Sequence, residues 1–177
     1  MSPLKEGDNL STFEKALICN NGHILTDCIA TDQHLLEVKY CKECGTKIIS
    51  GCPSCNTEIL GCEKYQYEGF MPNSVNTGYS GYSLPKFCHH CGEPYPWMQA
   101  ILKNLEEIID MADELDEVDK SILKEKFPEL LIESPEATAA ALRISKTLKA
   151  ASNTTVQALK SAAASKLVGH LFELIWK

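Results

Sequence analysis

The chain has 177 residues, of which 44% are hydrophobic and 23% are charged, and its formal net charge is −7 at pH 7. This length gives room for one or two small domains of ordinary globular composition. The acidic balance argues against a nucleic-acid-binding protein, because such proteins neutralise phosphates with clustered lysine and arginine. No run of about 20 apolar residues occurs, so we expect no helix that spans a bilayer.

Residues 1–15 form the first segment and predict a loose N-terminus, because Pro3, Gly7 and several charged side chains interrupt any apolar run. For the same reason the segment does not resemble a secretory signal peptide. Two cysteines outside any metal-ligand pattern, Cys28 and Cys62, fit a reducing compartment better than a secreted protein. We therefore expect a cytoplasmic protein.

The most informative stretch runs from residue 19 to residue 91 and holds eight soft metal ligands in four closely spaced pairs. The pairs are Cys19 with His23, Cys41 with Cys44, Cys52 with Cys55, and Cys88 with Cys91. A C-x2-C turn aims two sulfur atoms at one ion, and the glycines that follow two of these turns, Gly45 and Gly92, help the chain to reverse. Four pairs predict two structural Zn²⁺ ions, each with four ligands.

Two other uses of cysteine are less consistent with this pattern. Nine cysteines in a short chain are compatible with the disulfide framework of a secreted domain, but repeated C-x2-C pairs favour a metal. A redox-active C-x2-C motif needs one pair, whereas this chain has three such pairs together with Cys19-x3-His23. The zinc interpretation therefore explains more of the pattern than either alternative.

The spacing leaves open which pairs share an ion. In a sequential arrangement the first pair joins the second and the third joins the fourth, which gives two zinc ribbons in a row. In a crossed arrangement the first pair joins the third and the second joins the fourth, and in a nested arrangement the middle two pairs form one site. The sequential arrangement is favoured because neighbouring elements usually pair in space.

The motif Cys19-Asn-Asn-Gly-His23, followed by Tyr40-Cys41-Lys-Glu-Cys44-Gly45, resembles the bacterial zinc-ribbon pattern C-x-x-G-H … F-C-x-x-C-G. Three later motifs extend the likeness: Cys52-Pro-Ser-Cys55, Phe87-Cys88-His-His-Cys91-Gly92 and Pro94-Tyr95-Pro96-Trp97. From about Cys19 to its end, the chain resembles a bacterial family of double zinc-ribbon proteins with a helical C-terminal tail. The resemblance implies that His23 is a ligand and that the pairing is sequential, but it implies no activity.

Short apolar segments flank the ligand pairs within the predicted zinc domain, residues 16–95. They are residues 16–18, 24–26, 38–40, 47–49 and 58–60. Strands this short do not make a stable sheet alone, so zinc should provide much of the folding free energy of this domain.

Residues 63–86 form an insert within the second ribbon that is rich in tyrosine and glycine. Its aromatic side chains either cover the zinc sites or form a stacking surface for single-stranded nucleic acid. The second alternative is disfavoured, because only Lys64 and Lys86 supply positive charge there.

The joint to a helical domain, residues 96–177, lies at Pro94-Tyr95-Pro96-Trp97. Apolar spacing predicts a first helix to about Leu115 and a second that ends or kinks before Pro128. Ser134-Pro135-Glu136 predicts the start of a third helix, which runs to about Ala151. Its apolar stripe is Ala137, Ala141, Ile144 and Leu148. After a weak break at residues 152–155, a last helix carries Val156, Leu159, Ala163, Leu167, Leu171 and Leu174.

Charge changes sign within this domain. Residues 96–136 hold four basic and twelve acidic side chains, whereas residues 137–177 hold six basic and one acidic. The simplest account is an acidic helical pair that packs beside a basic one. The alternative is a basic amphipathic end that contacts a membrane surface or a partner.

The sequence contains no nucleophile elbow, phosphate loop or H-E-x-x-H motif. The eight ligands would also fill two zinc coordination shells, whereas a catalytic zinc keeps an open position. We therefore predict a zinc-stabilised α+β protein, with two zinc ribbons followed by three or four α-helices, that acts as a non-enzymatic interaction module. Residues 98–177 would bind a protein partner or self-associate. The alternatives are a nucleic-acid-binding ribbon protein and an effector that acts at a membrane surface through its basic helices.

Overall fold

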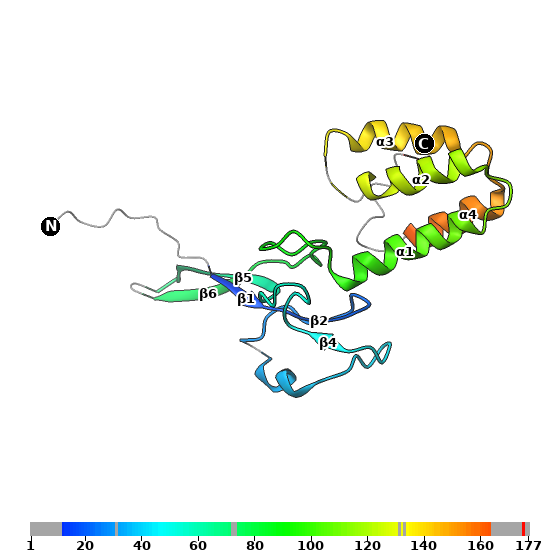
Figure 1. The fold of residues 1–177 in the computed structure, drawn as a ribbon. Helices are drawn as coiled ribbons and strands as arrows, with labels where there is room; N and C mark the ends of the chain where they lie inside the picture. The colour runs from blue at the N-terminus through cyan, green and yellow to red at the C-terminus, as the bar shows by residue number, and fades with distance from the viewer. Residues whose placement is uncertain are drawn as a thin grey trace. The chain divides into compact units, whose positions relative to one another are not determined.

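The computed structural model describes residues 12–30, 32–71, 74–130, 132, 134–163 and 175. These residues fall into two compact units, one ending at Trp97 and the other beginning at Met98. Figure 1 shows the strands, all in the first unit, and the α-helices, which lie almost entirely in the second. The described part is thus a small α+β fold with two antiparallel sheets and four α-helices. Four predicted features lie outside it: residues 1–11, Leu167, Leu171 and Leu174.

The sheet nearest the first ligand pair has three very short strands in the order β3-β2-β4. They are β2 (Leu17–Cys19), β3 (Ile24–Thr26) and β4 (Ile48–Ile49). All of β2 is buried, and Ile18 pairs with Ile24 on one side and Ile49 on the other. These strands lie where the apolar segments predicted them: β3 matches its segment, β2 is shifted by one residue and β4 begins one residue later.

The predicted strand at residues 38–40 is absent. A short 3-10 helix, η1 (Gln33–Glu37), precedes this segment, and only Tyr40 forms a bridge, to Lys47. Likewise, Glu58 forms a single bridge to Gly51, and the following strand begins at Leu60.

The second sheet has the order β1-β5-β6. Its strands are β1 (Thr12–Lys15), β5 (Leu60–Glu68) and β6 (Val75–Tyr79). The loose N-terminus predicted through residue 15 is therefore wrong for residues 12–15, which pair with β5. The Tyr/Gly-rich insert contains most of β5 and all of β6, which form a hairpin in continuous register.

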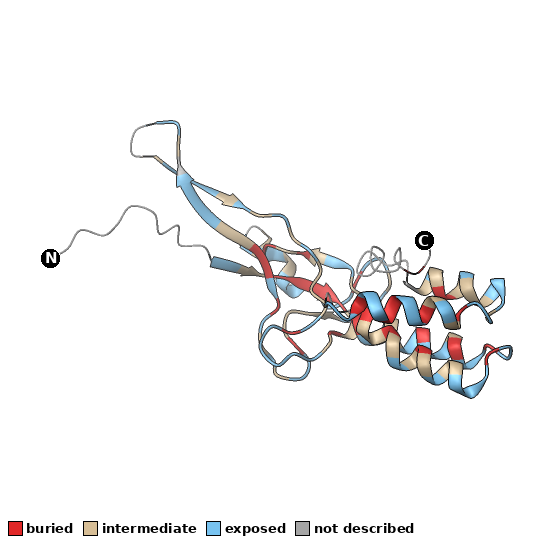
Figure 2. Ribbon diagram, turned by 90° about the horizontal axis from the view of Figure 1, so that it is seen from above, coloured by how far each residue is buried: buried red, intermediate tan, exposed pale blue. Residues whose placement is uncertain are grey.

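The aromatic side chains of this hairpin are exposed. The exposed fractions are 37% for Tyr65, 48% for Tyr67 and 41% for Tyr79, and Phe70 is fully exposed. In Figure 2 most of the hairpin ribbon has the pale blue of exposed residues. The prediction that the insert covers the zinc sites is therefore wrong for these four residues.

Trp97 closes the first unit at the start of α1 (Pro96–Asp110), which begins at the proline as predicted. The Trp97 ring stacks on Tyr95 with centroids 4.8 Å apart, and its Nε1–H donates to the Pro85 carbonyl at 2.8 Å. Gly22, in the turn of the first ligand pair, approaches the same side chain so closely that an added Cβ would lie 3.2 Å from the Trp97 Cβ.

The remaining helices are α2 (Glu117–Leu130), α3 (Ala137–Thr147) and α4 (Asn153–Ala163). α2 and α3 pack on each other. α2 buries Leu123, Phe127 and Leu130, and small alanines of α3 allow a close approach. The predicted stripe of α3 is confirmed, because all four of its residues are buried: Ala137, Ala141, Ile144 and Leu148. No helix in the described part of the chain is long and apolar enough to cross a bilayer.

Several predicted helix ends are wrong. α1 ends at Asp110 and α3 at Thr147, because the chain beyond each continues in tighter i→i−3 hydrogen bonds, such as Leu115 to Ala112 and Ala151 to Leu148.

Pro128 and Ser134 also have other roles at the helix ends than the sequence predicted. Pro128 lies inside α2, in its last turn, where it removes at most one helical hydrogen bond. Ser134 does not cap α3 with its side chain; its carbonyl accepts from the Ala137 N–H at 3.1 Å.

Candidate metal centres

Two clusters of potential metal ligands form in the first unit. One consists of Cys19, His23, Cys41 and Cys44, and the other of Cys52, Cys55, Cys88 and Cys91. Within each cluster the four ligand atoms all lie within 4.8 Å of one another. All eight residues predicted as ligands are thus brought together, and the grouping is the sequential one.

In the Cys₃His cluster the imidazole presents its Nδ1 atom to the three sulfurs. Nδ1 lies 3.5 Å from the Cys19 Sγ, 3.6 Å from the Cys41 Sγ and 3.3 Å from the Cys44 Sγ. The Cys19 and Cys44 sulfurs are 3.6 Å apart. The sequence does not specify which imidazole nitrogen faces the cluster.

In the Cys₄ cluster, Cys52 and Cys91 have sulfurs 3.7 Å apart, and those of Cys55 and Cys88 are 3.6 Å apart. A tetrahedron with Zn–S bonds of about 2.3 Å and Zn–N bonds of about 2.0–2.1 Å has S···S edges of about 3.8 Å and S···N edges of about 3.5 Å. Both clusters match these edges. None of the nine cysteines forms a disulfide, so both donor sets remain able to hold Zn²⁺.

Each ligand pair sits in a tight turn closed by a backbone hydrogen bond. The N–H of the residue after the second cysteine donates to the carbonyl of the first in three turns: Gly45 to Cys41, Asn56 to Cys52 and Gly92 to Cys88. These closing residues all have positive φ, from 61° to 76°. Asparagine tolerates this conformation better than most side chains, and Asn56 is the closing residue that the glycine pattern missed.

In each of these turns, the residues just before and just after the turn are joined by a backbone hydrogen bond and by a single β-bridge. The N–H of the first cysteine donates 2.8 Å bonds across the turn: Cys41 to Thr46, Cys52 to Thr57 and Cys88 to Glu93. One residue further out, the bridges are Tyr40 with Lys47, Gly51 with Glu58 and Phe87 with Pro94. The three C-x2-C turns therefore share one local geometry.

Two threonines support the clusters from outside the ligand set. The Thr46 hydroxyl lies 3.2 Å from the Cys44 Sγ, and the Thr57 hydroxyl lies 3.3 Å from the Cys55 Sγ. Hydrogen bonds from Thr46, first through its side chain and then its backbone, lower the pKa of Cys44 to about 6. Thr57 lowers the pKa of Cys55 in the same way. Neither threonine was predicted as a supporting residue, although a signal was present: C-x2-C-x-T occurs twice.

Three other thiols of the clusters differ in how readily they ionise. Burial raises the pKa of Cys41. The Glu93 backbone N–H lowers the pKa of Cys91, but burial and the three neighbouring sulfurs raise it further, to about 12. Burial also opposes ionisation of Cys88, yet backbone N–H groups of Cys91 and His90 bring its pKa down to about 6. Four thiolates this close together therefore require a cation among them, and a bound Zn²⁺ would supply that charge.

The remaining cysteines and histidines lie outside both clusters. Cys28 and Cys62 are buried, and desolvation raises the pKa of Cys62 to about 12, so this thiol is not an activated nucleophile. His34, His89 and His90 are exposed.

The fold and the clusters define a small α+β protein with two sites suited to Zn²⁺. A family model described as "Uncharacterized protein conserved in bacteria (DUF2321)" matches residues 12–168. The chain therefore belongs to this bacterial family. No curated protein and no solved structure matches it.

Proposed function

We propose that this protein is a non-enzymatic, double zinc-ribbon interaction module of the bacterial cytosol. One observation carries the proposal: each cluster offers four Cys or His donors within 4.8 Å, which is a complete shell for tetrahedral Zn²⁺. A zinc ion held in this way has no open position for water or a substrate. It would cross-link short strands, and in zinc-finger peptides such binding supplies about 10–16 kcal/mol of folding free energy.

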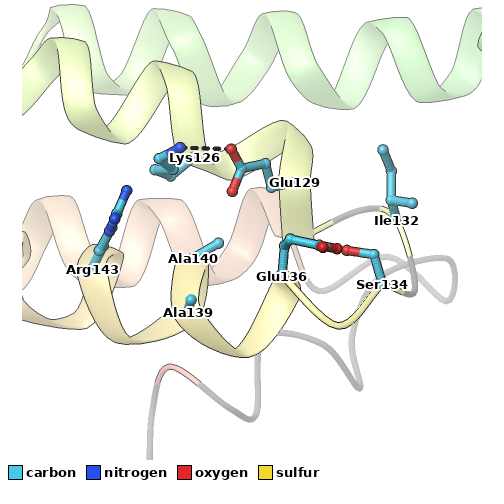
Figure 3. A pocket seen from close by; sticks show the side chains of 8 residues that line it. All are labelled: Lys126, Glu129, Ile132, Ser134, Glu136, Ala139, Ala140 and Arg143. Carbon is cyan, nitrogen blue, oxygen red and sulfur yellow. Dashed lines mark hydrogen bonds and ion pairs between the residues drawn. The ribbon is translucent and has the colours of Figure 1, made fainter.

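The helical unit, residues 98–177, supplies the partner-binding surface in this proposal. An open pocket of about 520 Å³ lies between α2 and α3. Figure 3 shows Lys126 and Glu129 of α2 on one wall and Ala139, Ala140 and Arg143 of α3 on the other.

The pocket combines apolar and charged groups. Ile132 at its edge is 49% exposed. Lys126 is neutralised by Glu125 at 2.8 Å and Glu129 at 2.6 Å. Lys126 and, more weakly, Arg143 lower the pKa of Glu125, but no ion pair joins Arg143 to a described residue. A protein segment with an apolar side chain next to a carboxylate would satisfy both Ile132 and Arg143.

A site-specific photo-crosslinker tests this surface in growing cells. The probe replaces the exposed Ala139 inside the pocket, and the control probe replaces Lys103, which is 77% exposed on α1. We expect a discrete adduct from position 139 that is absent from position 103 and weakens when Arg143→Glu is added. The adduct's mass separates a foreign partner from a second copy of the chain. Equal labelling from both positions, or none from position 139, contradicts the proposal.

Nucleic-acid binding is the second candidate, and one observation favours it: Tyr65 and Tyr67 expose rings with centroids 6.1 Å apart on one strand. Such rings can stack on bases. The acidic net charge of the chain weighs against it. It predicts retention of single-stranded nucleic acid at low salt that is lost steeply with added salt and with Tyr65→Ala; no retention at low salt rules it out.

A further inference from the structure

The outer edge of β6 is open. β6 is the last strand in the order β1-β5-β6, and no other strand in the described ranges pairs with its far side. Figure 1 shows it at the margin of its sheet. Val75 is 64% exposed and Tyr79 is 41% exposed, and Asn76 and Thr77 between them are also exposed.

The register of the hairpin determines which backbone groups point to this open edge. Ser80 donates to the Glu63 carbonyl at 2.8 Å, and Gly69 donates to the Ser74 carbonyl at 2.8 Å, so these pairs are hydrogen-bonded. In an antiparallel ladder, hydrogen-bonded and non-hydrogen-bonded pairs alternate. With the register of β5 and β6, the backbone groups of residues 76 and 78 face β5, and those of residues 75, 77 and 79 face outward.

This edge lacks the features by which proteins usually prevent strand addition. β6 contains no charged residue and no proline, and its pairing with β5 has no register shift. The opposite edge differs: β1 has a register shift, and its Lys15 forms an ion pair with Glu58.

We propose that β6 pairs antiparallel with β6 of a second copy of this chain, about a two-fold axis at Thr77. The three outward-facing residues are symmetric about Thr77. Thr77 would exchange both backbone hydrogen bonds with its own copy, and Val75 would exchange both with Tyr79 of the other copy. Every outward backbone group of the strand is thereby paired, and this self-complementarity is what a two-fold interface requires.

The side chains suit the same register. Threonine beside threonine and an aromatic ring beside a β-branched residue are favourable cross-strand pairs. Because β6 is uncharged, the axis brings no like charges together even though each chain carries a net charge of −7.

This interface goes beyond the proposed function, since it uses the strand hairpin and not the helical pocket. Two paired strands of five residues bury much less surface than the roughly 1,200 Å² of a stable interface. We therefore expect a reversible dimer that dissociates on dilution.

Sedimentation of the whole, zinc-loaded chain over a dilution series down from about 0.5 mM measures this dimer, because a dimer with a Kd as weak as about 1 mM is still populated at that concentration. Thr77→Lys places two ammonium groups at the axis. Asn76→Lys is the matched control, because it adds the same charge one residue away on the other face of the strand. We expect wild type and Asn76→Lys to dimerise alike and Thr77→Lys to dimerise at least tenfold more weakly, with zinc content unchanged.

Amide hydrogen exchange identifies the strand. The amides of Val75, Thr77 and Tyr79 should gain protection as concentration rises, whereas those of Asn76 and Gly78 are already bonded to β5 and should not change. The proposal is overturned if wild type stays monomeric, if Thr77→Lys dimerises like Asn76→Lys, or if the three amides exchange equally at all concentrations. Each of these results leaves the crosslinking test of the helical pocket unaffected.

Discussion

The Glu114 carboxylate accepts a hydrogen bond from the Thr155 hydroxyl at 2.7 Å, which ties the loop after α1 to the first turn of α4. The same carboxylate accepts the Ser152 N–H at 2.7 Å, and the Ser152 hydroxyl in turn accepts the Thr155 N–H at 3.2 Å. An anion at this helix start is also favoured by the helix dipole.

We predict that Glu114→Gln lowers the melting temperature of the helical signal at pH 6. The Thr155 hydroxyl, and then the Ser152 N–H, lower the pKa of Glu114 from 4.5 to about 2 in the folded state. The stabilisation is therefore complete above about pH 4.5 and is lost as pH falls through about 2. Circular dichroism of wild type and variant between pH 6 and 2 should show two melting temperatures that converge. Asp113→Asn, at an exposed neighbour without a hydrogen-bond partner among the described residues, is the control; a gap that stays constant over this range contradicts the mechanism.

Metal removal should affect the two units differently. The strands of the first unit have two to nine residues each, whereas the helical unit has its own buried core around Leu123, Phe127 and Ile144. We expect a strong chelator to remove two Zn²⁺ per chain, as the two clusters imply, to collapse the dispersed amide signals of the first unit and to leave most of the helical signal. Loss of all helical signal together with zinc would show that the units do not fold independently.

Single cysteine substitutions should each remove one zinc. Because the clusters do not share ligands, Cys52→Ser should leave only the ion at the Cys₃His cluster, and Cys41→Ser only the ion at the Cys₄ cluster. Cys28→Ser, at a buried cysteine outside both clusters, should keep two. Elemental analysis gives the stoichiometry. Loss of both ions from Cys52→Ser would indicate a shared core.

Thr46→Val should weaken zinc at the Cys₃His cluster about tenfold, the lower end for loss of a supporting hydrogen bond. The hydroxyl beside Cys44 favours its thiolate, and valine keeps the shape but not the hydrogen bond. Competition with a zinc-binding dye measures this affinity. Thr46→Ser should restore most of it, and Thr57→Val should shift the Cys₄ cluster instead. Unchanged affinity in Thr46→Val would leave the threonine a packing role only.

Three glycine substitutions should separate backbone strain from crowding. Gly22 and Gly45 have φ of +83° and +70°, so alanine at either costs about 1–2 kcal/mol. At Gly22 the new Cβ also lies 3.0 Å from Leu84, whereas nothing lies within 4 Å at Gly45 or Gly81. Chemical denaturation should therefore rank the losses Gly22→Ala, Gly45→Ala, Gly81→Ala, with the last near zero. Equal losses at Gly22 and Gly45 would remove the crowding argument.

The ligand sets were predictable because their chemistry is local. Two cysteines separated by two residues need little beyond their own turn to face one ion, as at Cys41 and Cys44. The apolar stripe of α3 was predictable for a similar reason, since the spacing of apolar residues in a helix can be detected within one short stretch of sequence.

Strand pairing was not predictable in the same way. Near the hairpin end of β5, Tyr65, Gln66 and Tyr67 are all exposed, so no buried face specifies the register of this strand. β1 exists only because β5 lies beside it. The repeated C-x2-C-x-T pattern marks Thr46, but the role of Asn56 in closing its turn follows only from the positive φ of that residue.

The stacked pair of Tyr95 and Trp97 has a spectroscopic consequence. Burial raises the pKa of Tyr95 above its ordinary value, and the sulfur of Cys88 beside its hydroxyl adds to this effect. The Trp97 side chain lies against Gly22, in the turn that holds Cys19 and His23. Tyr95 therefore lies beside a ligand of the Cys₄ cluster, and Trp97 lies against the turn that carries two ligands of the Cys₃His cluster. Once Trp176, the second of the two tryptophans, is replaced by phenylalanine, indole emission becomes an intrinsic optical probe that follows metal loading without any added label.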